Sequence, residues 1–241
     1  MLMNLWIKFT KENYLKYISH LDLMRMFQRT FRRCNVPIKY SQGFNPQPRM
    51  TIGNPLALGI ESSEEFMEIE LYKKMPVDEF INTVNKELPQ GIKILDAKYV
   101  DSKSSISSFI DWSYYEMQFV VNNIIDLTSL KISFQKLLEK DKLTIEKEKR
   151  KGNKITIQEK DVRPFIGNLT ISEEKSEKIS GNKYLITINC LLKSGDKGNL
   201  KPTDLLKVIE KYADLDIDSD TVEIKRLRIY SEIENRIEPL M

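Results

Sequence analysis

The chain has 241 residues, of which 30% are charged and 41% hydrophobic, a composition typical of a globular protein. Two cysteines and one histidine exclude a disulfide framework, a zinc site built on several Cys or His ligands and a Cys-bound iron–sulfur cluster; we also find no GxGxxG or GxxxxGK(S/T) phosphate loop. No stretch approaches the roughly 20 apolar residues of a membrane span and no secretory signal is seen, so we expect a cytoplasmic protein with no membrane contact, metal or cofactor.

The first hundred residues alternate between strand and helix patterns. Apolar residues at every second position predict strands, and apolar residues three or four apart predict helices. Ser19 stands three residues before Asp22, where its hydroxyl can cap a helix, and Pro76 suits the first turn of another. The expected elements are a strand at 5–9, a helix from 19 to about 34, a short strand at 50–52, a strand at 66–72, a helix from 76 and a strand at 92–100.

A Ser-rich connection follows, after which the same order of elements is expected again. Strands are expected at 115–121, 143–149, 154–159, 184–192 and 222–229, with helices at 130–138 and 202–212, whereas residues 160–183 show no clear pattern. The strands at 143–149 and 154–159 flank Gly152-Asn153, a turn signal that predicts a hairpin. The sequence therefore predicts an α+β protein of two tandem ferredoxin-like (βαββαβ) units with antiparallel sheets. The expected division is a first unit at 1–100, a linker at 101–112 and a second unit at 113–241.

Charge is unevenly distributed along the chain. Residues 1–60 contain nine basic and two acidic side chains, a net charge of +7, although the whole chain carries only +3. The remaining residues therefore sum to −4. Such an asymmetry suggests a polyanionic partner for the N-terminal quarter.

Four arginines share one side of the first expected helix. Arg25, Arg29, Arg32 and Arg33 are spaced i, i+4, i+7 and i+8, so all four project opposite the apolar stripe. Like charges at this spacing are mildly destabilising, and phosphate groups would offset them by accepting bidentate hydrogen bonds. The alternative is a solvated face paired with acids from elsewhere, such as Glu64 or Glu65.

The turn-rich segment 40–49 is a second candidate for RNA binding. Amides can contact base edges, aromatic rings can stack on unpaired bases, and arginine can hold phosphate. In the alternative interpretation the segment is a packed turn whose two aromatic rings plug the core. The candidate residues are Tyr40, Ser41, Gln42, Gly43, Phe44, Asn45 and Arg49.

His20 is the only candidate for acid–base catalysis. It stands at the start of the first helix, leaning towards the apolar stripe, where a hydrogen-bonded structural histidine would be ordinary. The functional alternative is a general acid or base for RNA strand cleavage, partnered by Tyr14, Tyr17 or Tyr40.

The segments Lys16–Arg25, Tyr40–Pro46 and Pro55–Ser62 resemble the radical SAM-linked protein family, a bacterial domain of unknown function. The resemblance is specific over about residues 5–75 and continues loosely through Asp161–Phe165 and Leu200–Pro202. It implies a partner, because the domain is encoded beside or fused behind a radical SAM protein with a B12-binding-type region, often near ribosomal-protein and ribonuclease G genes. It supplies no activity.

We therefore expect an RNA-binding accessory protein that works with a separately encoded radical SAM enzyme in RNA modification or maturation. One alternative is a metal-independent endoribonuclease using His20, by analogy with the CRISPR RNA endonucleases, which are also paired ferredoxin-like units. This chain lacks a clear glycine-rich loop near its C-terminus, unlike those enzymes. The other alternative is an adaptor whose arginines dock on an acidic surface of the radical SAM partner. Whether the protein is an enzyme stays open at this point.

Overall fold

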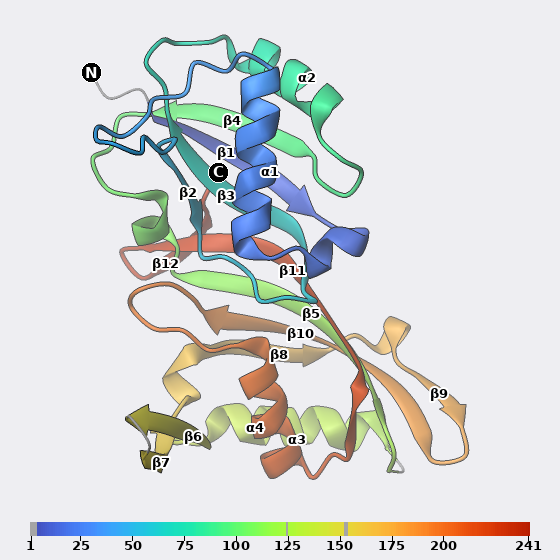
Figure 1. The fold of residues 1–241 in the computed structure, drawn as a ribbon. Coiled ribbons are helices and arrows are strands. Elements are labelled where there is room, and N and C mark those ends of the chain that lie inside the picture. The colour runs from blue at the N-terminus through green and yellow to red at the C-terminus, as the bar shows by residue number, and fades with distance from the viewer. Residues whose placement is uncertain (1–3, 124, 152–153) are drawn as a thin grey trace. The chain divides into compact units, whose positions relative to one another are not determined.

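The computed structural model describes residues 4–123, 125–151 and 154–241, and it is an α+β protein with a mostly antiparallel sheet (Figure 1). Four α-helices lie in the described residues. The chain divides into two compact units: unit 1 comprises Met1–Asp111 and Lys225–Met241, and unit 2 comprises Trp112–Ile224. No helix in the described part of the chain has the length and apolar character needed to cross a membrane.

Unit 1 has the order β-α-β-β-α-β followed by a C-terminal extension. Strand β3 pairs antiparallel with both β1 and β2, and β4 pairs antiparallel with the other edge of β1, which gives the spatial order β4-β1-β3-β2. Its elements are β1 (Asn4–Lys11), α1 (His20–Arg33), β2 (Met50–Gly53), β3 (Glu61–Glu70), α2 (Val77–Glu87), β4 (Ile94–Val100), the last part of β11 (Ile217–Ile233) and β12 (Arg236–Pro239).

One face of the unit 1 sheet is covered by α1 and α2 (Figure 1). Phe9 of β1 meets Phe27 edge-on at 5.0 Å, and Phe27, Phe31 and Phe80 continue the aromatic core across both helices. Burial of such rings supplies most of the apolar stabilisation of this layer. The sequence expectation of a helix from 19 to about 34 is confirmed by the side-chain cap of Ser19 on α1.

The other side of the unit 1 core includes residues that were expected to lie in a linker. Ile106 and Ile110 are buried together with Trp6, and they join Ile229 and Leu240 of the C-terminal extension in one cluster. This segment includes a short 3-10 helix, η2 (Ile106–Phe109), in which Ile106 is buried. The compact units therefore differ from the expected division, because residues 101–111 and 225–241 bury apolar side chains in unit 1.

Unit 2 differs from the expected order of elements because the two strands that follow its first helix do not join the main sheet. The sheet order is β11-β5-β10-β8, and β10 pairs antiparallel with β5 and β8. The hairpin β6-β7 forms a separate two-stranded sheet, and its expected Gly-Asn turn at 152–153 lies outside the described residues. The elements are β5 (Trp112–Val121), α3 (Leu127–Glu139), β6 (Thr144–Lys151), β7 (Lys154–Asp161), β8 (Ile166–Ile171), β9 (Glu177–Ser180), β10 (Lys183–Lys193), α4 (Pro202–Ala213) and the first part of β11.

Candidate nucleic-acid interface

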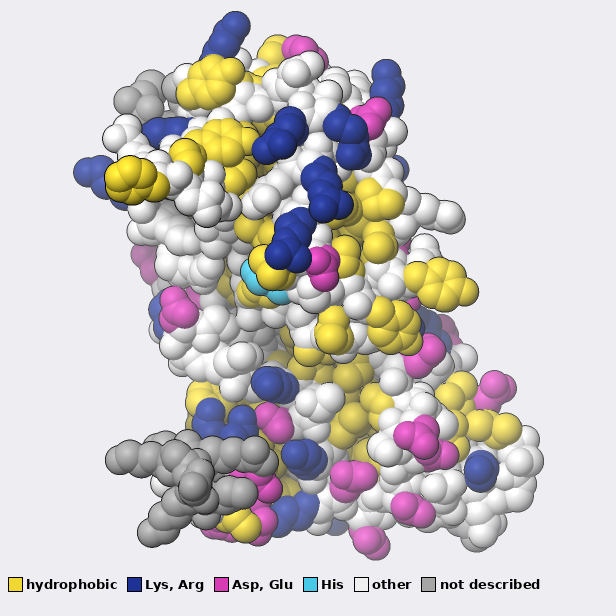
Figure 2. Space-filling model, in the orientation of Figure 1, with side chains coloured by type: hydrophobic (Ala, Val, Ile, Leu, Met, Phe, Trp, Pro, Cys, Tyr) yellow, Lys and Arg dark blue, Asp and Glu magenta, His cyan; other side chains and the backbone are white. Residues whose placement is uncertain are grey.

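Helix α1 presents its four arginines on the side opposite the core, and we call these residues the arginine row. Leu23, Phe27 and Phe31 of α1 are buried in unit 1. The helix begins at His20 because the Ser19 hydroxyl accepts the backbone N–H of Asp22 at 3.1 Å. Figure 2 shows Lys and Arg side chains gathered over α1. All members of the row are exposed: Arg25, Arg29, Arg32 and Arg33.

The two ends of the arginine row are paired with carboxylates of unit 1. The Arg25 guanidinium lies 3.1 Å from Asp22, and the Arg33 guanidinium donates to the Glu87 carboxylate at 2.9 Å and to its carbonyl at 3.0 Å. These contacts are exposed, so each stabilises the fold by at most about 1 kcal/mol. Arg33 also ties the end of α1 to the end of α2.

The middle of the arginine row has no such partner. Among the residues that the structure describes, the Arg29 and Arg32 side chains make neither an ion pair nor a hydrogen bond. A groove of about 570 Å³ runs beside this part of α1. It is lined by Ile18, Asp22, Arg25, Met26, Arg29, Thr30, Arg33, Glu87, Leu88 and Pro89.

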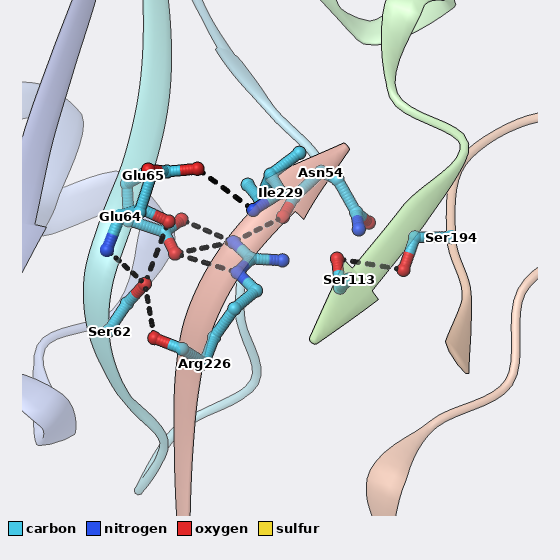
Figure 3. A network of polar contacts seen from close by, with 8 residues as sticks. All are labelled: Asn54, Ser62, Glu64, Glu65, Ser113, Ser194, Arg226 and Ile229. Carbon is cyan, nitrogen blue, oxygen red and sulfur yellow. Dashed lines mark hydrogen bonds and ion pairs between the residues drawn. The ribbon is translucent and has the colours of Figure 1, made fainter. Parts of the chain in front are cut away.

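The acids first considered as partners for the arginines are committed elsewhere. Glu64 is buried, accepts from Lys8 at 2.6 Å and receives the backbone N–H of Ile229 at 2.9 Å. Glu65 is also buried, and it pairs with Arg226 (Figure 3). The interpretation in which Glu64 or Glu65 neutralises the α1 face is therefore wrong.

Arg226 is the largest fully buried side chain of the described residues, and sequence reasoning missed it. Its guanidinium, 1% exposed, donates to Glu65 at 2.9 and 2.5 Å and to the Asn54 carbonyl at 3.0 Å (Figure 3). Nearby Lys11 is 3% exposed, and burial lowers the pKa of its ammonium group, partly offset by Glu65. Parallel pairing of Arg226 with Ser62 places this charge at the junction of β11 and β3.

The segment 40–49 is a closed loop held by its own hydrogen bonds, and we call it the 40–49 loop. Tyr40 pairs with Pro48 in a β-bridge, the Ser41 N–H donates to the Gln47 carbonyl at 2.8 Å, and the Gln47 N–H donates to the Ser41 hydroxyl at 2.9 Å. Gly43 has φ +132°, a conformation that L side chains rarely adopt, which explains a glycine at this turn. The backbone shape is thus defined independently of any ligand.

The side chains of the 40–49 loop point away from the core. Phe44 is fully exposed and Tyr40 is 40% exposed, so neither ring plugs the core as the alternative required. The Gln47 amide donates to the Asn45 side chain at 3.1 Å, and Gln42 is exposed. Figure 2 shows hydrophobic side chains over this loop on the same face of unit 1 as the charged side chains over α1.

Arg49, at the end of the 40–49 loop, differs from the unpaired arginines of α1. Its guanidinium contacts the Glu70 carboxylate at 3.1 Å, and Lys39 contacts the same carboxylate at 3.2 Å. All three side chains remain partly exposed. The pair of cations exceeds the single acid, so the base of the loop keeps a net positive charge.

His20 is exposed at the first residue of α1, not turned into the apolar stripe. In the described part of the chain its side chain has no hydrogen-bond partner to orient the ring. Tyr14 and Tyr17 lie in the 3-10 helix η1 (Asn13–Tyr17) just before α1, whereas Tyr40 follows the opposite end of α1. The three candidate phenols are therefore divided between the two ends of the helix.

Other features of the described residues do not resemble a reaction centre. A groove of about 860 Å³ in unit 2 lies between β6 and α4, but Lys147 pairs there with Asp204 at 3.0 Å and Lys211 donates to Thr144 at 3.2 Å. The described residues contain no group of three or more His, Cys, Asp or Glu side chains arranged to hold a metal ion. Cys190 is buried, and burial raises the pKa of its thiol.

Comparison with known families assigns the chain. Residues 4–202 match the family described as "Uncharacterized protein conserved in bacteria (DUF2344)". The chain belongs to the DUF2344 family. The match covers all of α1 and the 40–49 loop, so both candidate surfaces lie inside the DUF2344 region. No curated protein matches the chain.

Solved structures show only distant likeness to this DUF2344 protein. A crystal structure of a Cbf5-Nop10-Gar1 complex matches at a TM-score of 0.45 and 8% identity, over 95% of this chain and 50% of that chain. This chain thus spans half the length of the chain that it matches there. A crystal structure of an unknown protein from Galdieria sulphuraria matches at a TM-score of 0.26 and 10% identity, over 94% and 99% of the two chains. Both TM-scores are too low to assign a function.

Proposed function

We propose that this DUF2344 protein binds RNA through the arginine row and the 40–49 loop. The observation that carries the proposal is that Arg29 and Arg32 are exposed and make no ion pair or hydrogen bond among the described residues. Phe44 of the 40–49 loop is fully exposed, and the hydrophobic side chains over this loop lie on the same face of unit 1 as the charged side chains over α1 (Figure 2). Placing four like charges on successive turns costs about 0.2–0.5 kcal/mol for each close pair. A polyanion offsets that cost.

The two elements supply complementary contacts. Guanidinium groups donate paired, charge-assisted hydrogen bonds to phosphate oxygens, while exposed rings stack on unpaired bases and amides contact base edges. Arg29 and Arg32 bind phosphate without breaking an existing contact, whereas the paired arginines must exchange a carboxylate for a phosphate. Phosphate contacts are assigned to Arg25, Arg29, Arg32, Arg33 and Arg49, and base contacts to Tyr40, Ser41, Gln42, Gly43, Phe44 and Asn45.

The salt dependence of RNA affinity tests this assignment. For a single strand, each phosphate contact adds about −0.7 to the slope of log K against log salt, so five arginines predict a slope of about −3.5. Arg29→Ala/Arg32→Ala is expected to reduce its magnitude by about 1.4. The matched control is Arg228→Ala/Arg236→Ala, which removes two exposed arginines outside α1 and the loop. No binding at 50 mM salt, or equal slopes for both variants, would contradict the proposal.

We also propose that the protein delivers bound RNA to a radical SAM enzyme in the cytoplasm, in RNA modification or maturation. The support is the resemblance of Lys16–Arg25 and Tyr40–Pro46 to the radical SAM-linked family. Affinity purification of the tagged chain from its own cells, with and without nuclease, is the test. A radical SAM protein that co-purifies together with RNA supports the proposal. Recovery of that protein after nuclease, with no RNA retained at any stage, would instead support a protein adaptor.

A metal-independent endoribonuclease remains the catalytic alternative, because the imidazole of His20 is exposed beside η1. Incubation of labelled RNA with chelator, wild type and His20→Ala separates the alternatives. Cleavage by the wild type that is lost in the variant would establish the enzyme. RNA that is bound and left intact by both proteins supports an accessory role.

For the fold, we propose that both units are ferredoxin-like. The order β4-β1-β3-β2 in unit 1 supports this interpretation, and so does the equivalent order β11-β5-β10-β8 in unit 2. Unit 2 would then carry β6-β7 as an insertion between its first helix and its second sheet strand. An experimental structure of residues 4–241 tests the strand orders.

A further inference from the structure

A second exposed aromatic surface lies in unit 1, immediately before α1. Tyr14 and Tyr17 belong to η1, and side chains three residues apart in a 3-10 helix project from the same side. The two side chains are 90% and 63% exposed. We call them the tyrosine pair.

The backbone that carries the tyrosine pair is firmly anchored. The Glu12 N–H donates to the Gly91 carbonyl at 2.8 Å, and the Gly59 N–H donates to the Lys16 carbonyl at 2.9 Å. Leu15 packs against the core between the two exposed rings. A Cβ on Gly91 would lie 2.5 Å from the Glu12 carbonyl oxygen, so even an alanine would displace the segment. The rings are thus presented by a preformed support, which lowers the entropic cost of binding.

The arginine row extends between two aromatic ends. The tyrosine pair lies just before α1, which begins at His20, and Phe44 lies eleven residues beyond the last residue of α1, Arg33. Figure 2 shows hydrophobic side chains near both ends of the charged side chains over α1. Fourteen helical residues span about 21 Å. At about 3.4 Å per nucleotide, this length corresponds to roughly six nucleotides of a stacked strand.

We infer that the ligand is a single-stranded RNA segment of at least about six nucleotides, whose unpaired bases stack on the tyrosine pair at one end and on Phe44 at the other. This inference rests on the proposed RNA binding by the arginine row and narrows its substrate class. Paired bases in a duplex are stacked on each other and expose no face to a ring, so stacking selects single strands. The Lys16 ammonium lies 5.5 Å from the centroid of the Tyr17 ring, and the Tyr17 side chain is still 63% exposed.

Fluorescence anisotropy with end-labelled RNAs of 3 to 12 nucleotides, and with a 12-base-pair duplex, tests the inference. For the wild type, affinity should keep rising until the strand has at least about six nucleotides, and the duplex should bind more weakly than the single strand. Tyr14→Ala/Tyr17→Ala should weaken 12-nucleotide binding by about 5- to 150-fold per lost stack. Tyr14→Phe/Tyr17→Phe retains both rings and should bind within twofold of the wild type. Because stacking involves no counterion release, the alanine variant should keep the wild-type salt slope.

The outcomes of these measurements distinguish a failure of this inference from a failure of the proposed RNA binding on which it rests. Absence of wild-type RNA binding overturns both. RNA binding that is weakened by Arg29→Ala/Arg32→Ala but unchanged by Tyr14→Ala/Tyr17→Ala overturns the inference alone. Equal or tighter binding of the duplex also overturns it. Because both tyrosines are exposed, replacing them should leave the fold intact. Thermal melts of the variants and the wild type check this.

Discussion

Arg226 and the arginine row place the same side chain in opposite environments within unit 1. The buried guanidinium of Arg226 is matched by the Glu65 carboxylate and a backbone carbonyl, whereas Arg29 and Arg32 of the row are exposed and unpaired among the described residues. Taking a charge out of water is costly unless its partners are complete, while an exposed charge is stabilised by solvent. The comparison separates an arginine that serves the fold from arginines that remain available to a ligand.

The largest expected effect comes from breaking the buried pair. Arg226→Ala leaves the Glu65 carboxylate buried without its hydrogen-bonded partner and with only the nearby Lys11 ammonium as a counter-charge, so the free energy of unfolding should fall by about 3–5 kcal/mol in urea denaturation. The double variant Glu65→Leu/Arg226→Met replaces both charges by apolar groups and should recover only part of the loss, because the buried Lys11 then lacks the carboxylate that offsets its burial. A single variant that costs under about 1 kcal/mol would show that water reaches this site.

The next largest effect is expected from substitution of Phe44, which should weaken the affinity for RNA. Phe44→Ala removes a fully exposed ring, so the free energy of RNA binding should weaken by about 1–3 kcal/mol. Thermal stability should stay within about 0.5 kcal/mol of the wild type, because the ring makes no core contact. Phe44→Tyr retains a stacking surface and is the matched control. A loss of stability equal to the loss of affinity would point to a structural role.

The neighbours Arg32 and Arg33 sharpen the comparison along one helix. Arg33→Ala breaks an exposed contact to Glu87, so the free energy of unfolding should fall by about 0.5–1 kcal/mol. Arg32→Ala removes like-charge repulsion only, so stability should be unchanged or higher by a few tenths of a kcal/mol. Both should weaken RNA binding in low salt. Equal stability losses in the two variants would indicate that Arg32 has an intramolecular partner in solution.

Substitution of Asp22 is expected to have the smallest effect, a change in the dependence of stability on pH. The Ser19 hydroxyl, followed by Arg25, holds the pKa of its carboxyl below the ordinary value of 3.8. The folded state therefore gains stability from this carboxylate above pH 3.8 and loses it as the pH falls through the lowered pKa. Asp22→Asn should lack this part of the acid sensitivity in urea melts, and at neutral pH it should bind RNA slightly more tightly because Arg25 loses its competitor. Identical acid profiles for the two proteins would contradict the assignment.

Local patterns in the sequence predicted much of the arginine row. The boundaries of α1 follow from its 3.6-residue periodicity and from Ser19, because both act within one helical turn of the residues they affect. The ion pairs between residues far apart in the sequence could not be predicted in the same way. Arg226 meets Glu65 from 161 positions away, and no local pattern distinguishes Glu65 from an acid that would pair with α1.

The strand orders also could not be predicted from local sequence patterns alone. The hairpin β6-β7 was expected from two strand-like runs around a Gly-Asn turn signal, but that signal does not reveal that the hairpin forms a sheet of its own. Strand β8 takes the place beside β10 although it has six residues and only Ile166 and Leu169 are buried. The outward orientation of Phe44 was equally hidden, because an aromatic residue in a turn has the same composition whether it is buried or exposed.

The division of unit 1 into 1–111 and 225–241 has a consequence for synthesis on the ribosome. Glu65 emerges long before Arg226, and the whole of unit 2 is translated between them. Until residue 226 leaves the exit tunnel, the nascent first segment has a carboxylate that cannot be sequestered with its partner. Unit 2, whose residues are contiguous, can complete its fold earlier. The order of folding therefore need not follow the order of translation, and the cluster that joins Trp6, Ile106 and Ile110 to Ile229 and Leu240 is completed last.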